Sequence, residues 1–143
     1  MICAGHWRAK GEVNGMEQNR KEITITHAEE RRDLDLRINQ QCERLNRYLD
    51  DNLTDPSLCL VSVADHMNLS IYAVSRLVKR TAGRSFRAFI TQKRLELAFD
   101  LLQSSEASVR EIARRVGFEN PAYFSSVFKK HYGFSPISVK RDR

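Results

Sequence analysis

Ten residues near the C-terminus, PAYFSSVFKK (121–130), carry side chains of two kinds. Drawn as a helix with about 100° between successive residues, the segment gathers its large apolar groups on one side: Tyr123, Phe124, Val127 and Phe128. The opposite side is small, hydroxylated and basic, with no acid among its members, which are Ala122, Ser125, Ser126 and Lys129. Hydroxyl and ammonium groups on one helical face suit the base edges and phosphates of a nucleic acid. For a single helix of this kind, a solvated surface is the commoner explanation.

A second copy of this pattern lies fifty residues earlier in the chain. Segment 64–85 aligns with segment 113–135 when one extra residue is allowed in the turn of the later copy. The aligned pairs are Ala64 with Ala113, Ser70 with Asn120, Ser75 with Ser125, Lys79 with Lys129, Arg80 with Lys130, and Gly83 with Gly133. The outward side of the earlier helix carries Tyr72, Ser75, Arg76 and Lys79. Each copy has a short helix, a turn and a longer helix, which is the helix-turn-helix plan. The duplication favours a binding role for both faces.

The elements that must position these two faces are also predicted to be helical. An amphipathic stripe precedes Pro56, with members Leu34, Ile38, Cys42, Leu45, Leu49 and Leu53. Ser85 is a good N-cap for a longer helix over 85–104, and Ser108 with Glu111 forms a capping box. A short helix is predicted after Ser135. No strand-like alternation occurs, so the sequence predicts an all-α fold with one helix-turn-helix at about 60–83 and another at about 108–132.

The first part of the chain reads differently. Residues 1–33 are polar, mixed in charge and without a helical period, and Gly5, Gly11 and Gly15 are spread through them. Such a segment is predicted to be a disordered tail or linker ahead of a domain over 34–143. The sequence leaves open whether the chain is complete or the C-terminal part of a larger regulator.

Charge is distributed unevenly along the chain. Residues 1–63 hold 9 basic and 11 acidic side chains, whereas residues 64–143 hold 15 basic and 7 acidic ones. A strongly basic second half favours a polyanionic partner for that half. The three cysteines, Cys3, Cys42 and Cys59, form no CxxC motif and indicate a reduced, cytoplasmic protein. No apolar run is long enough for a membrane span.

The residue types assign different roles on DNA. Arg76 has the forked donor that pairs with guanine O6 and N7, while Tyr72 and Ser75 are its neighbours for base contact. Phosphate contacts are predicted for basic side chains and for helix N-termini with free N–H groups. These residues are Ser70, Lys79, Arg80, Ser85, Asn120, Lys129, Lys130 and Ser135.

Two other classes of function are possible in principle. A catalytic or metal site needs convergent groups, but His6, His27, His66 and His131 are scattered, and His131 is predicted to face inward. We therefore predict no enzyme activity, no metal and no cofactor. The second alternative is a helical adaptor whose basic faces bind an acidic protein. DNA binding would differ from it by a steep salt dependence and by sequence discrimination.

Three stretches resemble the AraC/XylS family of bacterial transcription regulators over residues 40–140. They are the first helix-turn-helix (Ala64, Asn68-Leu69-Ser70, Ser75-Arg76-Leu77, Lys79), the linker (Arg94-Leu95, Ala98, Leu101-Leu102), and the second motif (Ile112-Ala113, Gly117-Phe118, Tyr123-Phe124-Ser125, Phe128-Lys129-Lys130, Gly133-Phe134-Ser135-Pro136). The resemblance implies two helix-turn-helix subdomains of homeodomain-like type, joined by the long linker helix, on adjacent major-groove segments.

The resemblance also implies partners and contact residues. Double-stranded DNA and RNA polymerase are the implied partners, with activation of promoters as the usual mode and the nucleoid as the location. Base contacts of the second motif would fall on Pro121, Ala122, Ser125 and Ser126. A small-molecule effector is implied only if a further N-terminal domain exists, because the residues before the first motif are too few to build one.

Three positions depart from the family's pattern. Ser126 stands where many members have Arg, so the second motif lacks a forked guanine reader. Val139–Lys140 replaces a common Tyr-Arg pair, which predicts a weaker end of the fold, and Val78 replaces a large aromatic residue, which predicts a thinner local core.

Overall fold

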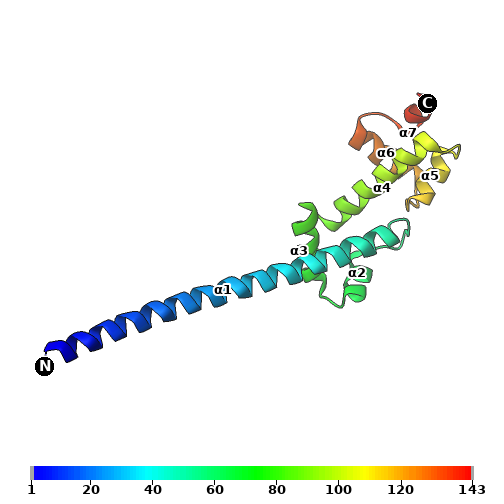
Figure 1. The fold of residues 1–143 in the computed structure, drawn as a ribbon. Coiled ribbons are helices and arrows are strands. Elements are labelled where there is room, and N and C mark those ends of the chain that lie inside the picture. Colours follow the sequence, from blue (N-terminus) through cyan, green and yellow to red (C-terminus); the bar gives the residue numbers. More distant parts are fainter. Residues whose placement is uncertain (1, 143) are drawn as a thin grey trace. The chain divides into compact units, whose positions relative to one another are not determined.

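The computed structural model describes the backbone of residues 2–142 and the side chains of residues 20–142 (Figure 1). All regular elements in this part are α-helices, as the sequence predicts. They are α1 (Ile2–Asn52), α2 (Leu60–Met67), α3 (Ile71–Ala82), α4 (Phe86–Ser104), α5 (Val109–Arg115), α6 (Pro121–Tyr132) and α7 (Pro136–Arg141). Contacts divide the chain into two units, Met1–Gln40 and Gln41–Arg143.

The first unit contains only the N-terminal part of α1. Its described side chains, from Arg20 onward, are exposed except for half-buried Ile38, and Leu34 remains 57% exposed. The helical conformation differs from the disordered tail predicted for residues 1–33. The chain has no proline before Pro56 and is rich in Glu, Arg and Lys, which are good helix formers. That residues 1–33 act as a separate tail or linker stays a prediction.

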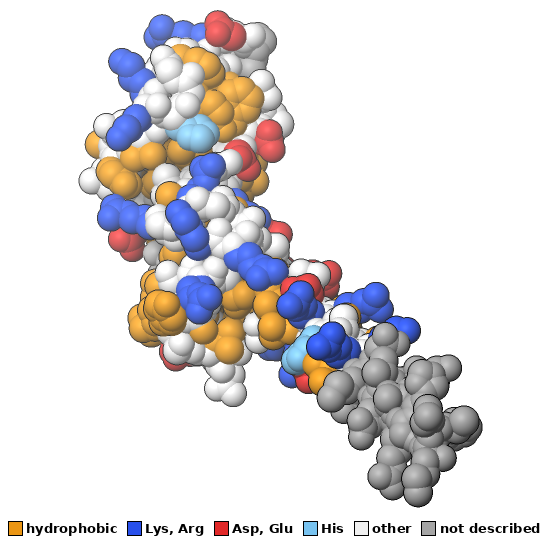
Figure 2. Space-filling model, turned by 90° about the vertical axis from the view of Figure 1, so that its left-hand side faces the viewer, with side chains coloured by type: hydrophobic (Ala, Val, Ile, Leu, Met, Phe, Trp, Pro, Cys, Tyr) orange, Lys and Arg blue, Asp and Glu red, His pale blue; other side chains and the backbone are white. Residues whose placement is uncertain are grey.

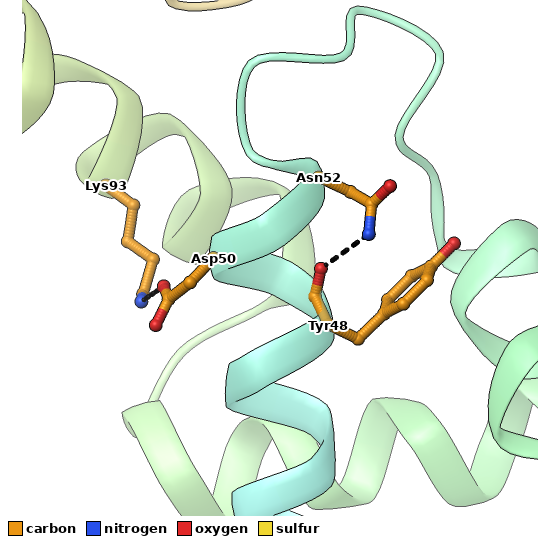
Figure 3. Close-up of polar contacts among 4 residues, drawn as sticks. All are labelled: Tyr48, Asp50, Asn52 and Lys93. Atoms are coloured by element: carbon orange, nitrogen blue, oxygen red, sulfur yellow. Dashed lines mark hydrogen bonds and ion pairs between the residues drawn. The ribbon is translucent and has the colours of Figure 1, made fainter.

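In the second unit, the end of α1 packs with the first helix-turn-helix. Leu45 and Leu49 are fully buried, and the inward residues of α2 and α3 are buried as well. The Tyr48 ring stacks on His66 of α2, with 4.0 Å between ring centroids. Asp50 forms an ion pair with Lys93 of α4, and Asn52 closes the helix by donating from Nδ2 to the Tyr48 carbonyl at 2.8 Å (Figure 3). The buried stripe therefore begins later than the sequence predicts.

A larger core joins α4 to the second helix-turn-helix and α7. Its buried members are Leu95, Ala98, Leu102, Ile112, Ala113, Val116, Phe118, Phe124, Phe128 and Val139. Aromatic rings form its centre, with Phe124 between Phe118 at 5.2 Å and Phe128 at 5.7 Å. Because α4 contacts α3, α5 and α7, it belongs to both subdomains and serves as the linker helix (Figure 1).

The helix starts follow the local rules that the sequence suggested. Ser70 Oγ accepts from the Ala73 N–H at 3.1 Å, and Ser85 Oγ accepts from the Ala88 N–H at 3.3 Å. Ser108 and Glu111 form the predicted capping box. Gly83 and Gly133 end α3 and α6 with φ of +69° and +84°, in the left-handed region that favours glycine.

The C-terminal helix is anchored by the residues that depart from the family's pattern. Val139 is buried in the larger core, at 8% exposure. The Lys140 ammonium donates to the carbonyl of Ala107 and, at 3.4 Å, to that of Ser105. Both carbonyls lie in the connection between α4 and α5, so Lys140 ties the end of the fold to the linker helix.

Two side chains differ in burial from the sequence prediction. Tyr123 is 46% exposed instead of facing inward with Phe124. His131 is exposed instead of packed in the core, although its ring meets that of Tyr132 edge-on. Both residues lie at the border of the apolar stripe of α6, where a helical wheel alone cannot tell which neighbour covers them.

The burial of two adjacent leucines in α4 gives a test of the core. Leu102 is fully buried, whereas Leu101 is only partly buried. Leu102→Ala should lower the free energy of unfolding by ~2–5 kcal/mol because it leaves a cavity. Leu101→Ala should cost clearly less. Urea unfolding of both variants checks the order, and an equal cost would contradict this packing.

Candidate nucleic-acid interface

The spacing of the apolar residues in α3 determines which side of the helix faces outward. Val74, Leu77 and Val78 are buried. This fixes the rotation of the helix, so that the predicted contact residues all point to solvent. Tyr72, Ser75, Arg76, Lys79 and Arg80 are exposed, Tyr72 by 71%. The structure thus brings the first set of predicted contact residues together on one helix.

The two largest side chains on this face lie against each other. Arg76 Cζ lies 5.7 Å from the centroid of the Tyr72 ring. A guanidinium over an aromatic face is held by a cation–π attraction that leaves its edge N–H groups free to donate. The Tyr72 ring therefore holds Arg76 in place while its N–H groups remain available as a forked donor.

The outward face of α6 is shallower and less charged at its start. Ala122 and Ser126 are exposed, while Pro121 and Ser125 are half-buried. Lys129 and Lys130 are exposed in the last turn. No residue of this face carries a forked donor, and its cations lie near the C-terminal end of the helix.

The N-terminus of α6 holds fewer free donors than the sequence predicts. Asn120 Oδ1 accepts from the N–H groups of Ala122 at 2.9 Å and Tyr123 at 3.2 Å. Pro121 has no N–H, and the Phe124 N–H already donates to the Asn120 carbonyl at 3.0 Å. At α3, by contrast, the Ser70 side chain uses only the Ala73 N–H. A phosphate at the start of α6 would have to meet the side chains.

The sequence reasoning passed over two basic residues at the start of the linker helix. Arg84 and Arg87 flank the Ser85 cap, and both are exposed. They border a hollow between α4 and α6 that Lys130 and His131 also line. Arg84 and Arg87 are three residues apart at a helix start, and this spacing places them on one side of the helix start, which the sequence alone could have shown. Figure 2 shows one face of the molecule with Lys and Arg side chains spread among apolar, uncharged and some acidic ones.

Among residues 20–142, no cluster of three or more His, Cys, Asp or Glu is placed to hold a metal ion. Within the same part of the chain, none of the helices combines the length and the apolar character that crossing a membrane requires.

A model of a helix-turn-helix domain family matches residues 63–142, which include most of the first motif, the linker helix, the second motif and α7. The chain belongs to the AraC/XylS family. The arabinose operon regulatory protein of Escherichia coli strain K12 is 34% identical over 107 residues, which are 75% of this chain and 35% of that protein. The chain spans only 31–35% of the length of the first curated relatives that it matches.

Solved structures show the same architecture. The C-terminal domain of AraT, a response regulator from Geobacillus stearothermophilus, is 39% identical with a TM-score of 0.68, covering 72% of this chain and 85% of that one. The DNA-binding domain of AdpA, solved in complex with a target DNA, has a TM-score of 0.66 over 71% of this chain and 90% of its own. At 22% identity, this second likeness concerns the fold alone.

In this AraC-family domain, one arginine of the linker helix holds the loop after α1 and lies against the turn of the second motif. Arg94 of α4 donates from Nε to the Leu53 carbonyl at 2.8 Å and from Nη2 to the Asp55 carbonyl at 2.7 Å. Burial lowers the pKa of the Arg94 guanidinium, and the nearby Asp55 carboxylate opposes that shift. The two carbonyls thus compensate a cation that is partly withdrawn from water.

Gly117 lies directly against this guanidinium. Its φ is +102°, and a Cβ built on it would lie 2.9 Å from both Cζ and Nε of Arg94. The turn between α5 and α6 therefore requires glycine for two reasons, the backbone conformation and the close approach of a side chain. Arg94 thereby connects the loop after α1, the linker helix and the second motif.

Gly117→Ala should lower the free energy of unfolding by about 1–3 kcal/mol because of backbone strain. A further loss is expected because the added Cβ displaces the Arg94 guanidinium from the two carbonyls to which it donates. Gly83→Ala is the matched control, since Gly83 also has positive φ but a Cβ added there would meet no atom within 4 Å. The two glycine variants are compared by thermal unfolding.

An Arg94→Met background separates the two effects. There, Gly117→Ala should cost less than it does beside Arg94, because only the backbone strain is left. If the cost of Gly117→Ala is the same with and without Arg94, the close approach of the guanidinium is not what restricts this position.

Proposed function

We propose that this chain is the DNA-binding part of a bacterial transcriptional regulator, which reads two adjacent major-groove segments with α3 and α6. The observation that carries the proposal is the pair of outward, acid-free faces on α3 and α6, attached to one continuous linker helix. Membership of the AraC/XylS family supports it. So does the solved complex of AdpA with its target DNA, a domain of the same fold.

The two helix-turn-helix motifs, α2–α3 (the first head) and α5–α6 (the second head), make different contributions in this proposal. Arg76, supported by Tyr72, reads a guanine in the major groove, and Ser75 adds a hydrogen bond beside it. The second head contacts the groove with Pro121, Ala122, Ser125 and Ser126, whose short side chains allow close approach but little discrimination. Phosphates are bound by the basic residues Lys79, Arg80, Lys129 and Lys130 and at the helix starts Ser70, Ser85 and Ser135. Asn120 is left out of this set, because its side chain already accepts from the N–H groups at the start of α6. The first head therefore carries more of the sequence preference.

The regulator acts as an activator that recruits RNA polymerase to promoters. It is cytoplasmic and associated with the nucleoid. A small-molecule effector belongs to this proposal only if the protein has a further N-terminal domain. A basic helical adaptor for an acidic protein is the less favoured alternative. No observation on α3 or α6 favours it over DNA.

Selection from a random double-stranded DNA pool tests the central proposal. The immobilised chain should enrich a bipartite site whose two parts are separated by about one helical turn of DNA, roughly 34 Å. Binding to that site should weaken steeply as salt is raised. Absence of any enriched motif, with salt-dependent capture of all sequences alike, would contradict sequence-specific recognition.

Arg76→Ala should weaken binding to the selected site by about 1–3 kcal/mol and relax the preference at one base pair. Arg76→Lys retains the charge but loses the fork, so it should also relax that preference. The measurement is fluorescence anisotropy with the selected site and all its single-base-pair variants. Equal discrimination by the wild type and Arg76→Ala would remove Arg76 from base recognition.

Lys129→Ala is the matched comparison on the second head. It should weaken binding to every sequence by a similar factor and reduce the slope of log affinity against log salt by about 1. Measuring both variants across the same DNA set separates the roles. A changed base preference in Lys129→Ala would show that the phosphate assignment is wrong.

A further inference from the structure

A hollow of about 470 Å³ lies between the first turns of α4 and the last turns of α6. Its apolar floor includes Leu95 and Val127. Most of the remaining lining is polar or basic. The complete lining is Arg84, Ser85, Arg87, Ala88, Thr91, Gln92, Leu95, Val127, Lys130 and His131.

The charged residues that line this hollow are all basic. Arg84, Arg87 and Lys130 are cationic, His131 adds a donor, and the described lining contains no carboxylate. Arg84 donates to the neutral Gln92 amide oxygen, and Arg87 Nη2 lies 3.4 Å from the Tyr123 hydroxyl. Neither guanidinium is paired with a carboxylate in the described structure. Glu96, which does not line the hollow, accepts from Gln92 Nε2 at 2.8 Å. Cations that line one hollow repel one another, and an anion bound between them reduces that repulsion.

The hollow adjoins both of the helices that are proposed to read DNA, α3 and α6. Arg84 and Ser85 directly follow Gly83, where α3 ends, so one wall begins at the first head. The other wall is formed by Val127, Lys130 and His131 of α6. Lys130 directly follows Lys129 of the outward face, about 100° further round the helix. A duplex that touches α3 and α6 together must present its sugar–phosphate backbone to the protein between the two major-groove segments.

We propose that this hollow binds backbone phosphates of the DNA between the two reading segments. The inference rests on the proposed function and adds Arg84, Arg87 and His131 to the contacts. These groups bind phosphate without reading bases, and they hold the duplex against the linker helix. Phosphate is the recognised chemistry, and DNA is its source, since the hollow lies beside two DNA-reading helices.

Site-specific neutralisation of phosphates tests this assignment. Methylphosphonates replace the phosphates between the two parts of the selected site, and affinity is measured for the wild type and for Arg84→Gln/Arg87→Gln. The wild type should lose roughly tenfold in affinity on the neutralised DNA. The double variant should lose a similar factor on normal DNA, with a salt slope smaller by about 1–2. It should then be insensitive to the methylphosphonates.

The controls separate local contact from general charge. Arg47→Gln removes one exposed cation of α1 that does not line the hollow, and it should keep the full sensitivity to methylphosphonates. Methylphosphonates outside the bound site should affect no variant. Because Arg87 also contacts Tyr123, Arg84→Gln alone is measured as well, and unfolding temperatures establish that the variants are folded.

The outcomes distinguish the two proposals. If the wild type selects no DNA sequence, the proposed function itself fails. If it selects a site but central methylphosphonates leave its affinity unchanged, the hollow assignment is overturned and the function stands. The same conclusion follows if inorganic phosphate or ATP saturates the hollow at micromolar concentration while the methylphosphonates have no effect, because a free phosphate ligand would then be the occupant.

Discussion

The guanidinium of Arg94 is the contact on which the arrangement of this domain depends. It belongs to the linker helix, donates to the carbonyls of Leu53 and Asp55, and lies against Gly117. Three segments far apart in sequence therefore meet at one planar cation. Asp55 also accepts from the Ser57 N–H at 2.8 Å, which fixes the loop whose carbonyls Arg94 uses. Because hydrophobic packing is not directional, a bidentate donor of this kind supplies an orientation that packing alone would leave loose.

The duplicated motif shows how one backbone plan can carry two different outward faces. Both longer helices are fixed by buried residues at corresponding positions, Val74 and Phe124, and both end at a left-handed glycine. Their outward faces differ in reach. Arg76 projects a stacked, forked donor, whereas Ser125 and Ser126 leave the surface of α6 close to its backbone. In our proposal the first head discriminates between bases, whereas the second head approaches the groove closely without reading it in detail. This division follows from side-chain length and not from the fold.

Sequence reasoning works best where structure is decided locally. The caps at Ser70, Ser85 and Ser108 and the all-helical class depend on neighbouring residues, and the structure confirms them. It works less well where a neighbouring element decides exposure. Tyr123 is expected to be buried but is 46% exposed, with its hydroxyl beside Arg87 of α4. The basic hollow escapes sequence reasoning for the same reason, because its two walls are separated by about forty residues and only tertiary packing brings them together.

The cap of α6 also constrains how the second head can bind an anion. Asn120 uses its side chain to satisfy two N–H groups, and Pro121 supplies none, so the positive end of that helix is already compensated. Negative charge near α6 must then be met by Lys129, Lys130 and the groups of the adjoining hollow. These lie in the last turn of the helix, where its dipole is negative and stabilises them as cations. The sequence of one short helix thus places its cations in the last turn, beside the hollow that Arg84 and Arg87 also line.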